Sequence, residues 1–116
     1  MTTIHPLEAR RTARIRELND MLRTTFIGGR VVITAGVRER GAAFESACVE
    51  AVQSFREFTE GNDPYGEHDF GAVTVENTKV FFKIDYFDRA LAFGSEDPSD
   101  PIRTARVLTI LLAEEY

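Results

Sequence analysis

The spacing of apolar residues predicts, in order, a helix, a strand and a second helix in the first half of the chain. From about Pro6 to Thr25, apolar side chains recur at helical spacing, at Leu7, Ile15, Leu18, Leu22 and Phe26. The glycine pair at residues 28–29 predicts the end of this helix, because glycine readily adopts a positive φ. The β-branched run from Arg30 to Thr34 then predicts a short strand.

The strongest helical period lies between about Ala42 and Phe58. Apolar side chains there step by four, four, three and three residues, at Phe44, Cys48, Val52, Phe55 and Phe58. Cys48 is in the middle of this stripe, whereas reactive thiols need a polar or cationic setting. The pattern therefore predicts a buried, unreactive thiol.

Two alternating strands around a tight turn follow in the second half. Residues 70–75 and 80–87 are the predicted strands and 76–79 the turn, where an asparagine tolerates positive φ. The even-numbered side chains of the second strand are apolar and are expected to pack on the helices. The opposite face carries Lys83 and Asp85, which either form a surface ion pair or line a ligand-binding strip framed by aromatic residues.

The end of the chain predicts one more strand and a last helix. Residues 91–93 are a candidate third antiparallel strand. Asp100 followed by Pro101 is a strong helix start, so a last helix is expected that is capped by Asp100 and has Glu114 and Glu115 at its C-terminal end. Together the elements predict an α+β fold, with a small antiparallel sheet of three to four strands and three helices packed mainly on one face.

Length and composition fit a single domain over residues 1–116. Of the 116 residues, 43% are hydrophobic, and nine phenylalanines with no tryptophan should supply much of the core. The only cysteine, Cys48, excludes an intrachain disulfide and favours a reducing compartment. No apolar run approaches the roughly 20 residues that cross a bilayer. We therefore expect a cytoplasmic protein that does not bind membranes.

Charge is unevenly distributed along the chain, whose net charge is -5. Residues 1–58 hold nine Lys and Arg against seven Asp and Glu, and residues 59–116 hold five against twelve. Four arginines crowd the start of the first helix, at Arg10, Arg11, Arg14 and Arg16. Such a cluster could bind nucleic acid, but no aromatic residues interleave with it and the acidic half would repel phosphates. A solvated helix face is the simpler interpretation, and direct nucleic-acid binding is not expected.

Residues 62–71, with the sequence Asn-Asp-Pro-Tyr-Gly-Glu-His-Asp-Phe-Gly, hold most of the candidate chemistry. His68 could act as a general acid or base oriented by Asp63 or Asp69. In an extended segment, Glu67 and Asp69 would share one face and His68 would point to the other. Alternatively, the stretch is a turn held by side-chain hydrogen bonds, and His68 satisfies a backbone carbonyl or a carboxylate.

Common catalytic and metal-binding motifs are missing from the sequence. It has no nucleophile elbow, no phosphate-binding P-loop and no His-Glu-x-x-His pair. Two histidines, His5 and His68, and one cysteine do not make a structural zinc motif. We therefore predict no cofactor and no metal.

Several stretches of the chain resemble a family of short bacterial proteins known only as a domain of unknown function. Residues 62–71 carry the resemblance. Further similar stretches are Leu18-Asn19-Asp20, Phe26-Ile27-Gly28-Gly29-Arg30, Lys83-Ile84-Asp85-Tyr86, Gly94-Ser95-Glu96-Asp97-Pro98, and the ending from Val107 through Ala113-Glu114-Glu115-Tyr116. The similarity covers about Ile15 to Tyr116. It implies no activity and no catalytic residues, but it implies a context, because such proteins are often carried by plasmids or other mobile elements.

Two functions remain open on this basis. The favoured one is a non-enzymatic protein-interaction module with an acidic face that could imitate nucleic-acid phosphates. That face would comprise Asp63, Glu67, Asp69, Asp85, Asp88, Glu96, Asp97 and Asp100, and the expected contact residues are Tyr65, Glu67, Asp69, Lys83, Asp85, Asp88, Glu96 and Asp97. The alternative is a small hydrolase or transferase centred on His68, with Asp63, Glu67 and Asp69 as the other candidate catalytic residues.

Overall fold

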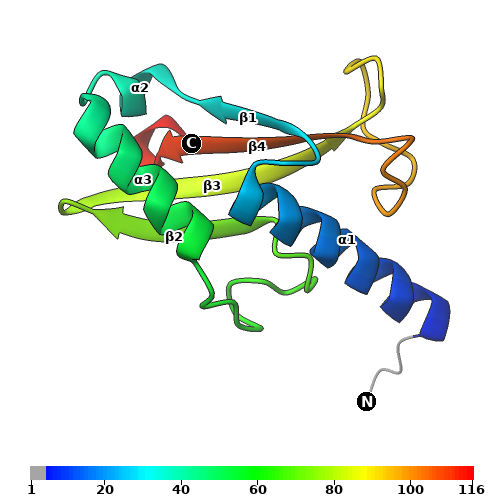
Figure 1. The fold of residues 1–116 in the computed structure, drawn as a ribbon. Helices are drawn as coiled ribbons and strands as arrows, with labels where there is room; N and C mark the ends of the chain where they lie inside the picture. Colours follow the sequence, from blue (N-terminus) through cyan, green and yellow to red (C-terminus); the bar gives the residue numbers. More distant parts are fainter. Residues whose placement is uncertain (1–4) are drawn as a thin grey trace.

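The protein is a four-stranded sheet with its α-helices on one face, seen in a computed structural model that describes residues 5–116 (Figure 1). Along the chain the elements are α1 (Pro6–Thr25), β1 (Arg30–Ile33), α2 (Ala35–Arg38), α3 (Ala42–Ser54), β2 (Phe70–Val75), β3 (Thr78–Phe87), β4 (Ala105–Leu112) and the 3-10 helix η1 (Ala113–Glu115). The strand order is β1-β4-β3-β2. β1 pairs with β4 in parallel and the other pairs are antiparallel. The predicted α+β class is confirmed, although the sheet is mixed rather than wholly antiparallel.

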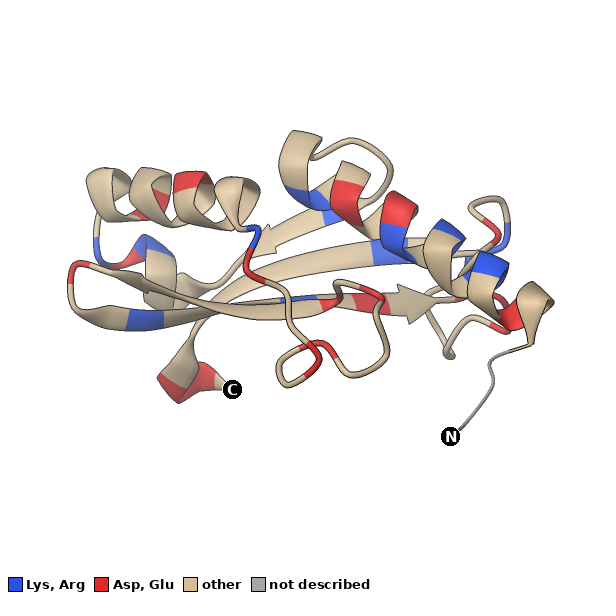
Figure 2. Ribbon diagram, turned by 90° about the horizontal axis from the view of Figure 1, so that it is seen from below, with Lys and Arg blue, Asp and Glu red and all other residues tan. Residues whose placement is uncertain are grey.

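The core lies between the sheet and the two longer helices, α1 and α3 (Figure 2). On β3, the even-numbered side chains Val80, Phe82 and Ile84 are buried, as the alternation predicts. Their partners across the β3–β4 ladder are Leu112, Ile110 and Leu108, which are buried as well. The helix-facing side of the two central strands is therefore a continuous apolar surface.

α3 is shorter than its periodicity predicts. It ends at Ser54, and Phe55 already has an extended backbone with φ -62° and ψ 132°. Phe55 and Phe58 still pack on the core, but from the connection that follows the helix. Cys48 is fully buried on α3, and burial raises the pKa of its thiol, which agrees with an unreactive role.

The predicted last helix is wrong, because its residues form β4. Asp100 does start a turn, in which its carboxylate accepts a hydrogen bond from the amide of Ile102 at 2.9 Å. The turn ends there, and the chain continues as a strand from Ala105. A central strand is an almost continuous apolar run, so its residues satisfy helical spacing equally well.

The predicted strand at residues 91–93 is also wrong. Leu91 has a positive φ of 59°, and its amide donates to the carbonyl of Asp88 at 2.9 Å, so this segment is a turn. The segment contributes only an isolated bridge, between Phe87 and Gly94. The hairpin turn between β2 and β3 is tighter than predicted, with Glu76 and Asn77 both at positive φ.

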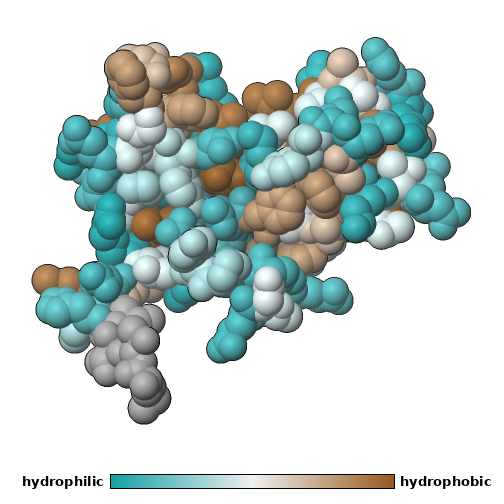
Figure 3. Space-filling model, turned by 180° about the vertical axis from the view of Figure 1, so that it is seen from behind, coloured by the Kyte–Doolittle hydropathy of each residue, from teal (hydrophilic) through white to brown (hydrophobic). Residues whose placement is uncertain are grey.

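No α-helix among residues 5–116 covers the other side of the sheet, which we call the open face and where only the short 3-10 helix η1 lies (Figure 2). It carries an aromatic cluster in which the ring centroids of Phe70 and Phe81 are 5.0 Å apart. Tyr116, which follows η1, lies 5.9 Å and 5.6 Å from these two rings. Hydrophilic side chains separate the apolar patches on this side of the molecule (Figure 3).

Candidate functional site

Residues 55–69 connect α3 to β2 as a folded loop. Asn62 organises it, because its Nδ2 donates to the carbonyl of Glu57 at 2.8 Å and its Oδ1 accepts from the amide of Thr59 at 2.7 Å. Gly66 takes a φ of 69°, which glycine adopts without strain. The stretch is thus a turn held by side-chain hydrogen bonds.

The imidazole ring of His68 is hydrogen-bonded at one nitrogen and stacked on one face. Its Nδ1 lies 2.8 Å from Oδ1 of Asp20 on α1, and its Nε2 lies 3.6 Å from Oδ2 of Asp63. The ring stacks on Phe58, with centroids 3.8 Å apart and 5° between the planes. His68 has a φ of 56°, and its amide donates to Oδ1 of Asp63 at 3.1 Å. We call these four residues the His68 cluster.

The sequence identified only part of the His68 cluster. Asp63 lies beside His68, as one prediction had it, whereas Asp69 makes no hydrogen bond or ion pair to His68. Asp20 was missed, because it approaches from α1, 48 residues away in the chain. The sequence signals were the polar pair Asn19-Asp20, next to the apolar stripe of the first predicted helix, and the presence of this pair in one of the stretches that resemble the family.

A pocket of about 240 Å³ opens beside the His68 cluster, lined by Asp20, Arg23, Thr24, Arg56, Phe58 and His68. The side chain of Arg23 is only 2% exposed, and its NH1 donates to the carbonyls of Val52 and Phe55 at 3.1 and 2.8 Å. The guanidinium of Arg23 therefore supplies hydrogen-bond donors to carbonyls at the C-terminal end of α3, where no further helical turn provides amide donors. Nδ1 of His68 is bonded to Asp20, whereas Nε2 is 3.6 Å from Asp63, beyond hydrogen-bond distance. The bond to Asp20 fastens the 55–69 loop to α1.

A second group of polar residues, which we call the Asn19 network, seals the contact between α1 and the sheet. Asn19 is fully buried, and its Nδ2 donates to the carbonyl of Glu67 at 2.9 Å and to the hydroxyl of Tyr86 at 2.7 Å. Its Oδ1 accepts from Nε of Arg106 at 2.6 Å. The hydroxyl of Tyr86 in turn donates to Oε1 of Glu67 at 2.7 Å. One asparagine thus joins α1 to β3, β4 and the 55–69 loop.

Burial shifts the ionisation of several groups around this network. Burial, and after it the hydrogen bond to Glu67, raises the pKa of Tyr86 far above its usual range. Burial lowers the pKa of Arg106 below its usual value. The pKa of Asp69 is raised, first by burial and then by neighbouring carboxylates. These shifts have structural causes and do not by themselves mark a catalytic group.

The remaining predicted contact residues lie in three separate places. Tyr65 is 78% exposed on the 55–69 loop. Lys83 and Asp85 form an ion pair of 2.8 Å on the open face. The others belong to the connection between β3 and β4: Asp88 accepts from the amide of Ala92, Glu96 pairs with Arg103, and Asp97 accepts from Arg11 and Ser99. The structure does not gather the predicted residues into one site.

Two arginines of the cluster on α1 hold the acidic loops. Nε of Arg11 donates to Asp97 at 3.1 Å, and NH1 of Arg16 donates to the carbonyl of Gly66 at 2.8 Å. Arg14 pairs with Glu17 on the helix itself. Of these contacts, only the ion pair between Arg11 and Asp97 joins charged groups from the two halves of the chain.

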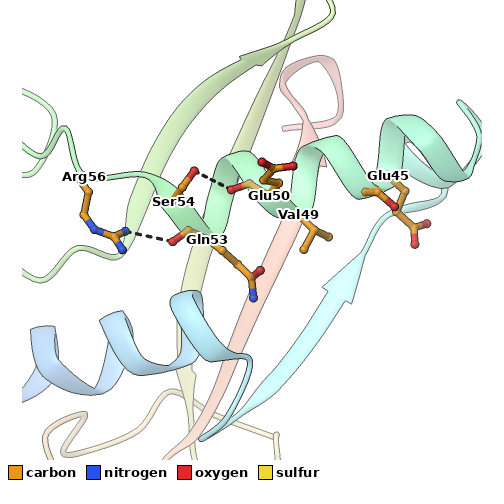
Figure 4. A pocket seen from close by; sticks show the side chains of 7 residues that line it. Glu45, Val49, Glu50, Gln53, Ser54 and Arg56 are labelled. Atoms are coloured by element: carbon orange, nitrogen blue, oxygen red, sulfur yellow. Dashed lines mark hydrogen bonds between the residues drawn. The ribbon is translucent and has the colours of Figure 1, made fainter.

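Other features define no site. A depression of about 440 Å³ on the outer side of α3 is lined only by residues 45–56, so no second element closes it (Figure 4). Within residues 5–116, no three His, Cys, Asp or Glu side chains are arranged to hold a metal ion. The helices in the same range include none that is long and apolar enough to span a membrane.

These observations define an α+β protein with a one-sided mixed sheet, in which a polar network joins an N-terminal helix to the sheet. The chain belongs to the family described as "Protein of unknown function (DUF3768)", whose model matches residues 33–115. The matched range includes Asp63 and His68 but excludes α1 and Asp20. No curated protein and no solved structure matches the chain. The resemblance to an uncharacterised family is thereby confirmed.

Proposed function

We propose that the protein is a non-enzymatic interaction module that binds a partner protein through residues 88–104, the β3–β4 loop. The expected partner presents an apolar pocket with a basic rim. Three properties of the loop support this proposal: its length, its exposed apolar side chains and its fixed shape.

The observation that carries the proposal is a long loop displaying bulky apolar side chains. Phe93 is 76% exposed and Ile102 is 82% exposed. Connections longer than about 15 residues without regular structure are uncommon in small domains and are usually functional when ordered. Exposed apolar groups of this size are typical anchors of protein interfaces.

The β3–β4 loop is also held in shape before any partner binds. The hydroxyls of Ser95 and Thr104 are 2.7 Å apart and join its two arms. NH1 of Arg89 donates to the carbonyl of Thr104 at 3.3 Å, and Arg106 donates to the carbonyl of Pro98. A loop that is already ordered loses less conformational entropy on binding, which favours affinity.

The charge of the β3–β4 loop indicates the chemistry of the partner. It holds four carboxylates against two arginines: Asp88, Glu96, Asp97 and Asp100 against Arg89 and Arg103. A basic rim on the partner complements this excess of negative charge. The wider acidic face predicted from sequence contributes less, because Asp63 is buried and Glu67 is bonded to Tyr86.

A variant comparison in host lysate tests the proposal. Immobilised wild type should retain a protein at physiological salt that Phe93→Ser does not retain. Val32→Ser is the matched control, because Val32 is an exposed apolar residue on a different edge of the molecule, at 45% exposure. In calorimetry, the purified partner should bind wild type at least tenfold more tightly than it binds Phe93→Ser. Its affinity for wild type should fall when the salt concentration is raised.

Equal retention by wild type and Phe93→Ser, or no retained protein at physiological salt, would contradict this function. The expected association with mobile elements guides the choice of lysate, which should come from a host that carries the plasmid or phage.

A second candidate function is a small hydrolase or transferase that uses His68. The observation in its favour is the 2.8 Å contact between His68 and Asp20 beside the pocket of about 240 Å³. Nε2 makes no hydrogen bond to any of residues 5–116, and it is the nitrogen that would exchange a proton with a substrate.

The test of this second function is turnover of a panel of ester, phosphoester and glycoside substrates. Wild type should show activity that falls at least a hundredfold in His68→Gln. Circular dichroism of the variant must match that of wild type, so that loss of fold does not explain the result. No turnover by wild type, or equal turnover by the variant, would contradict this second function.

A further inference from the structure

The outer side of β2 is an unpaired sheet edge. Strand alternation shows which groups it presents: the amide of Ile84 donates to the carbonyl of Asp69 at 2.8 Å, so Asp69 and every second residue after it bond inward to β3. The amides and carbonyls of Ala72 and Thr74 therefore point away from the sheet. Within residues 5–116 these groups form no hydrogen bond.

β2 lacks the features by which proteins protect an edge strand. Its six residues, Phe-Gly-Ala-Val-Thr-Val, include no charged residue and no proline. The other edge strand, β1, has four residues and begins with the charged Arg30. Short edges and charged residues discourage pairing with another chain, so β1 is protected and β2 is not.

A groove lies along the same edge, between β2 and the end of α3. It has a volume of about 490 Å³ and is lined by Ala51, Ser54, Phe55, Arg56, Glu57, Ala72, Val73 and Thr74. Phe55 and Ala51 give it an apolar part. Arg56 and Glu57 place opposite charges next to each other beside the strand.

We propose that β2 pairs antiparallel with β2 of a second copy of the chain, about a twofold axis near Val73. In that register Ala72 of each copy lies opposite Thr74 of the other. The outward amide and carbonyl of each of these residues are then hydrogen-bonded to the residue opposite. The side chain of Val73 belongs to the helix-facing set of β2. In the second copy it would face the apolar part of the groove, near Phe55.

Charge identifies a second copy as the occupant of the edge. A twofold axis can bring Arg56 of one copy to Glu57 of the other, and Glu57 to Arg56, so the pair is complementary to itself. An unrelated extended segment would use the same amides but would gain nothing from this arrangement. The pairing also joins the two sheets, so the open faces form one surface with two Phe70–Phe81–Tyr116 clusters.

Sedimentation equilibrium over a wide concentration range, together with a proline variant, tests the dimer. Wild type should have twice the 13.1 kDa mass of one chain. Ala72→Pro removes only an outward amide, which the β2–β3 ladder does not use, and should give a monomer. Val32→Lys, which adds a charge to the other edge strand, is the matched control and should remain a dimer.

Amide hydrogen exchange on wild type keeps the proposal testable if Ala72→Pro fails to fold. In the proposed dimer, the amides of Ala72 and Thr74 should be protected, and their protection should fall on dilution. A wild type that stays monomeric at the highest concentration overturns the proposal. So does a dimer in which these two amides exchange freely, since its interface would lie elsewhere. Neither result bears on partner binding by the β3–β4 loop.

Discussion

α3 and α1 cover the same face of the sheet but contact it with different chemistry. α3 buries three residues, Phe44, Cys48 and Val52, none of which forms a side-chain hydrogen bond. α1 buries Ile15 and Leu22 together with two polar residues, Asn19 and Arg23. One half of the core is therefore apolar, and the other half is sealed by hydrogen bonds.

The difference indicates what each helix contributes. Apolar contacts are non-directional, so α3 supplies stability without fixing its partners closely. Each polar group buried under α1 needs a specific partner, which leaves few positions that α1 can occupy. Arg23 also caps α3, and Asn19 joins three segments from the second half of the chain, namely the 55–69 loop, β3 and β4. α1 thus determines the positions of the loops, including His68.

The largest effect is expected in the apolar half, from Phe82→Ala. Phe82 is fully buried, and its ring contacts those of Phe55 and Phe58 at 5.5 and 6.3 Å between centroids. Truncation leaves a cavity and should lower the free energy of unfolding by about 3–5 kcal/mol. Urea denaturation gives this number directly.

Phe81→Ala is the control for that substitution, because Phe81 is the next residue on the same strand but lies on the open face, half-buried. Its loss should lower stability by less than half as much as Phe82→Ala. Equal losses would mean that something covers the open face as tightly as the helices cover the other.

In the polar half, Asn19→Ala should cost about 2–4 kcal/mol, because Nε of Arg106 loses its partner and the hydroxyl of Tyr86 keeps only its bond to Glu67. Asn62→Ala is the matched control. It also removes amide hydrogen bonds, to Thr59 and Glu57, but in an exposed loop where water replaces them. A loss in Asn19→Ala no greater than that in Asn62→Ala would show that the Asn19 network does not hold α1. Denaturation of both variants in urea is the measurement.

The sequence predicted elements that depend on local spacing. α3 and the β2–β3 hairpin have a clear period, so their inward faces were predicted correctly, although α3 ends at Ser54 rather than near Phe58 and β3 begins at Thr78 rather than Val80. The Asp100-Pro101 signal also formed its turn, but the following apolar run fits a helix and a central strand equally well. Pairing with β3 on one side and β1 on the other makes this run a strand, and the β1 partner lies far away in the chain.

The candidate site was less predictable, because its contacts are long-range. Asn19 and Asp20 lie beside an apolar stripe that ends in Leu22, and nothing local marks them as buried partners of Tyr86 and His68. Of the two carboxylates that the sequence offered as partners of His68, Asp63 lies beside its ring and Asp69 does not bond it. The partners from α1 follow only from the way the helix docks on the sheet.

Tyr86→Phe should have a smaller effect at neutral pH, of about 1–2 kcal/mol, because it removes the hydroxyl between Asn19 and Glu67. The variant should also change the response to alkali. The pKa of Tyr86 is raised above the usual 10.0, so its contribution is fully present below pH 10.0 and is lost as the pH rises further, where only the unfolded state ionises. Wild type should therefore lose stability faster than Tyr86→Phe above pH 10.0 in urea denaturation.

Tyr65→Phe, on the exposed loop, should show the same decline of stability with pH as wild type. Parallel alkaline curves for wild type and Tyr86→Phe would show that the hydroxyl is not sealed from solvent.

Asp69→Asn should have the smallest effect on stability, and unlike the other substitutions it should stabilise the fold at neutral pH. Burial raises the pKa of Asp69 above the usual 3.8, which means that the folded state holds its proton more tightly than the unfolded state. The stability that this group contributes is therefore present below pH 3.8 and is lost as the pH rises through the folded pKa. At neutral pH the carboxylate destabilises the fold, and the neutral amide should raise the thermal midpoint slightly. The gain should shrink as the pH falls toward 3.8.

Glu60→Gln, an exposed change on the same loop, should leave the midpoint unchanged at both pH values. A lower midpoint for Asp69→Asn at neutral pH would mean that the charge of Asp69 stabilises the junction of the 55–69 loop with β2.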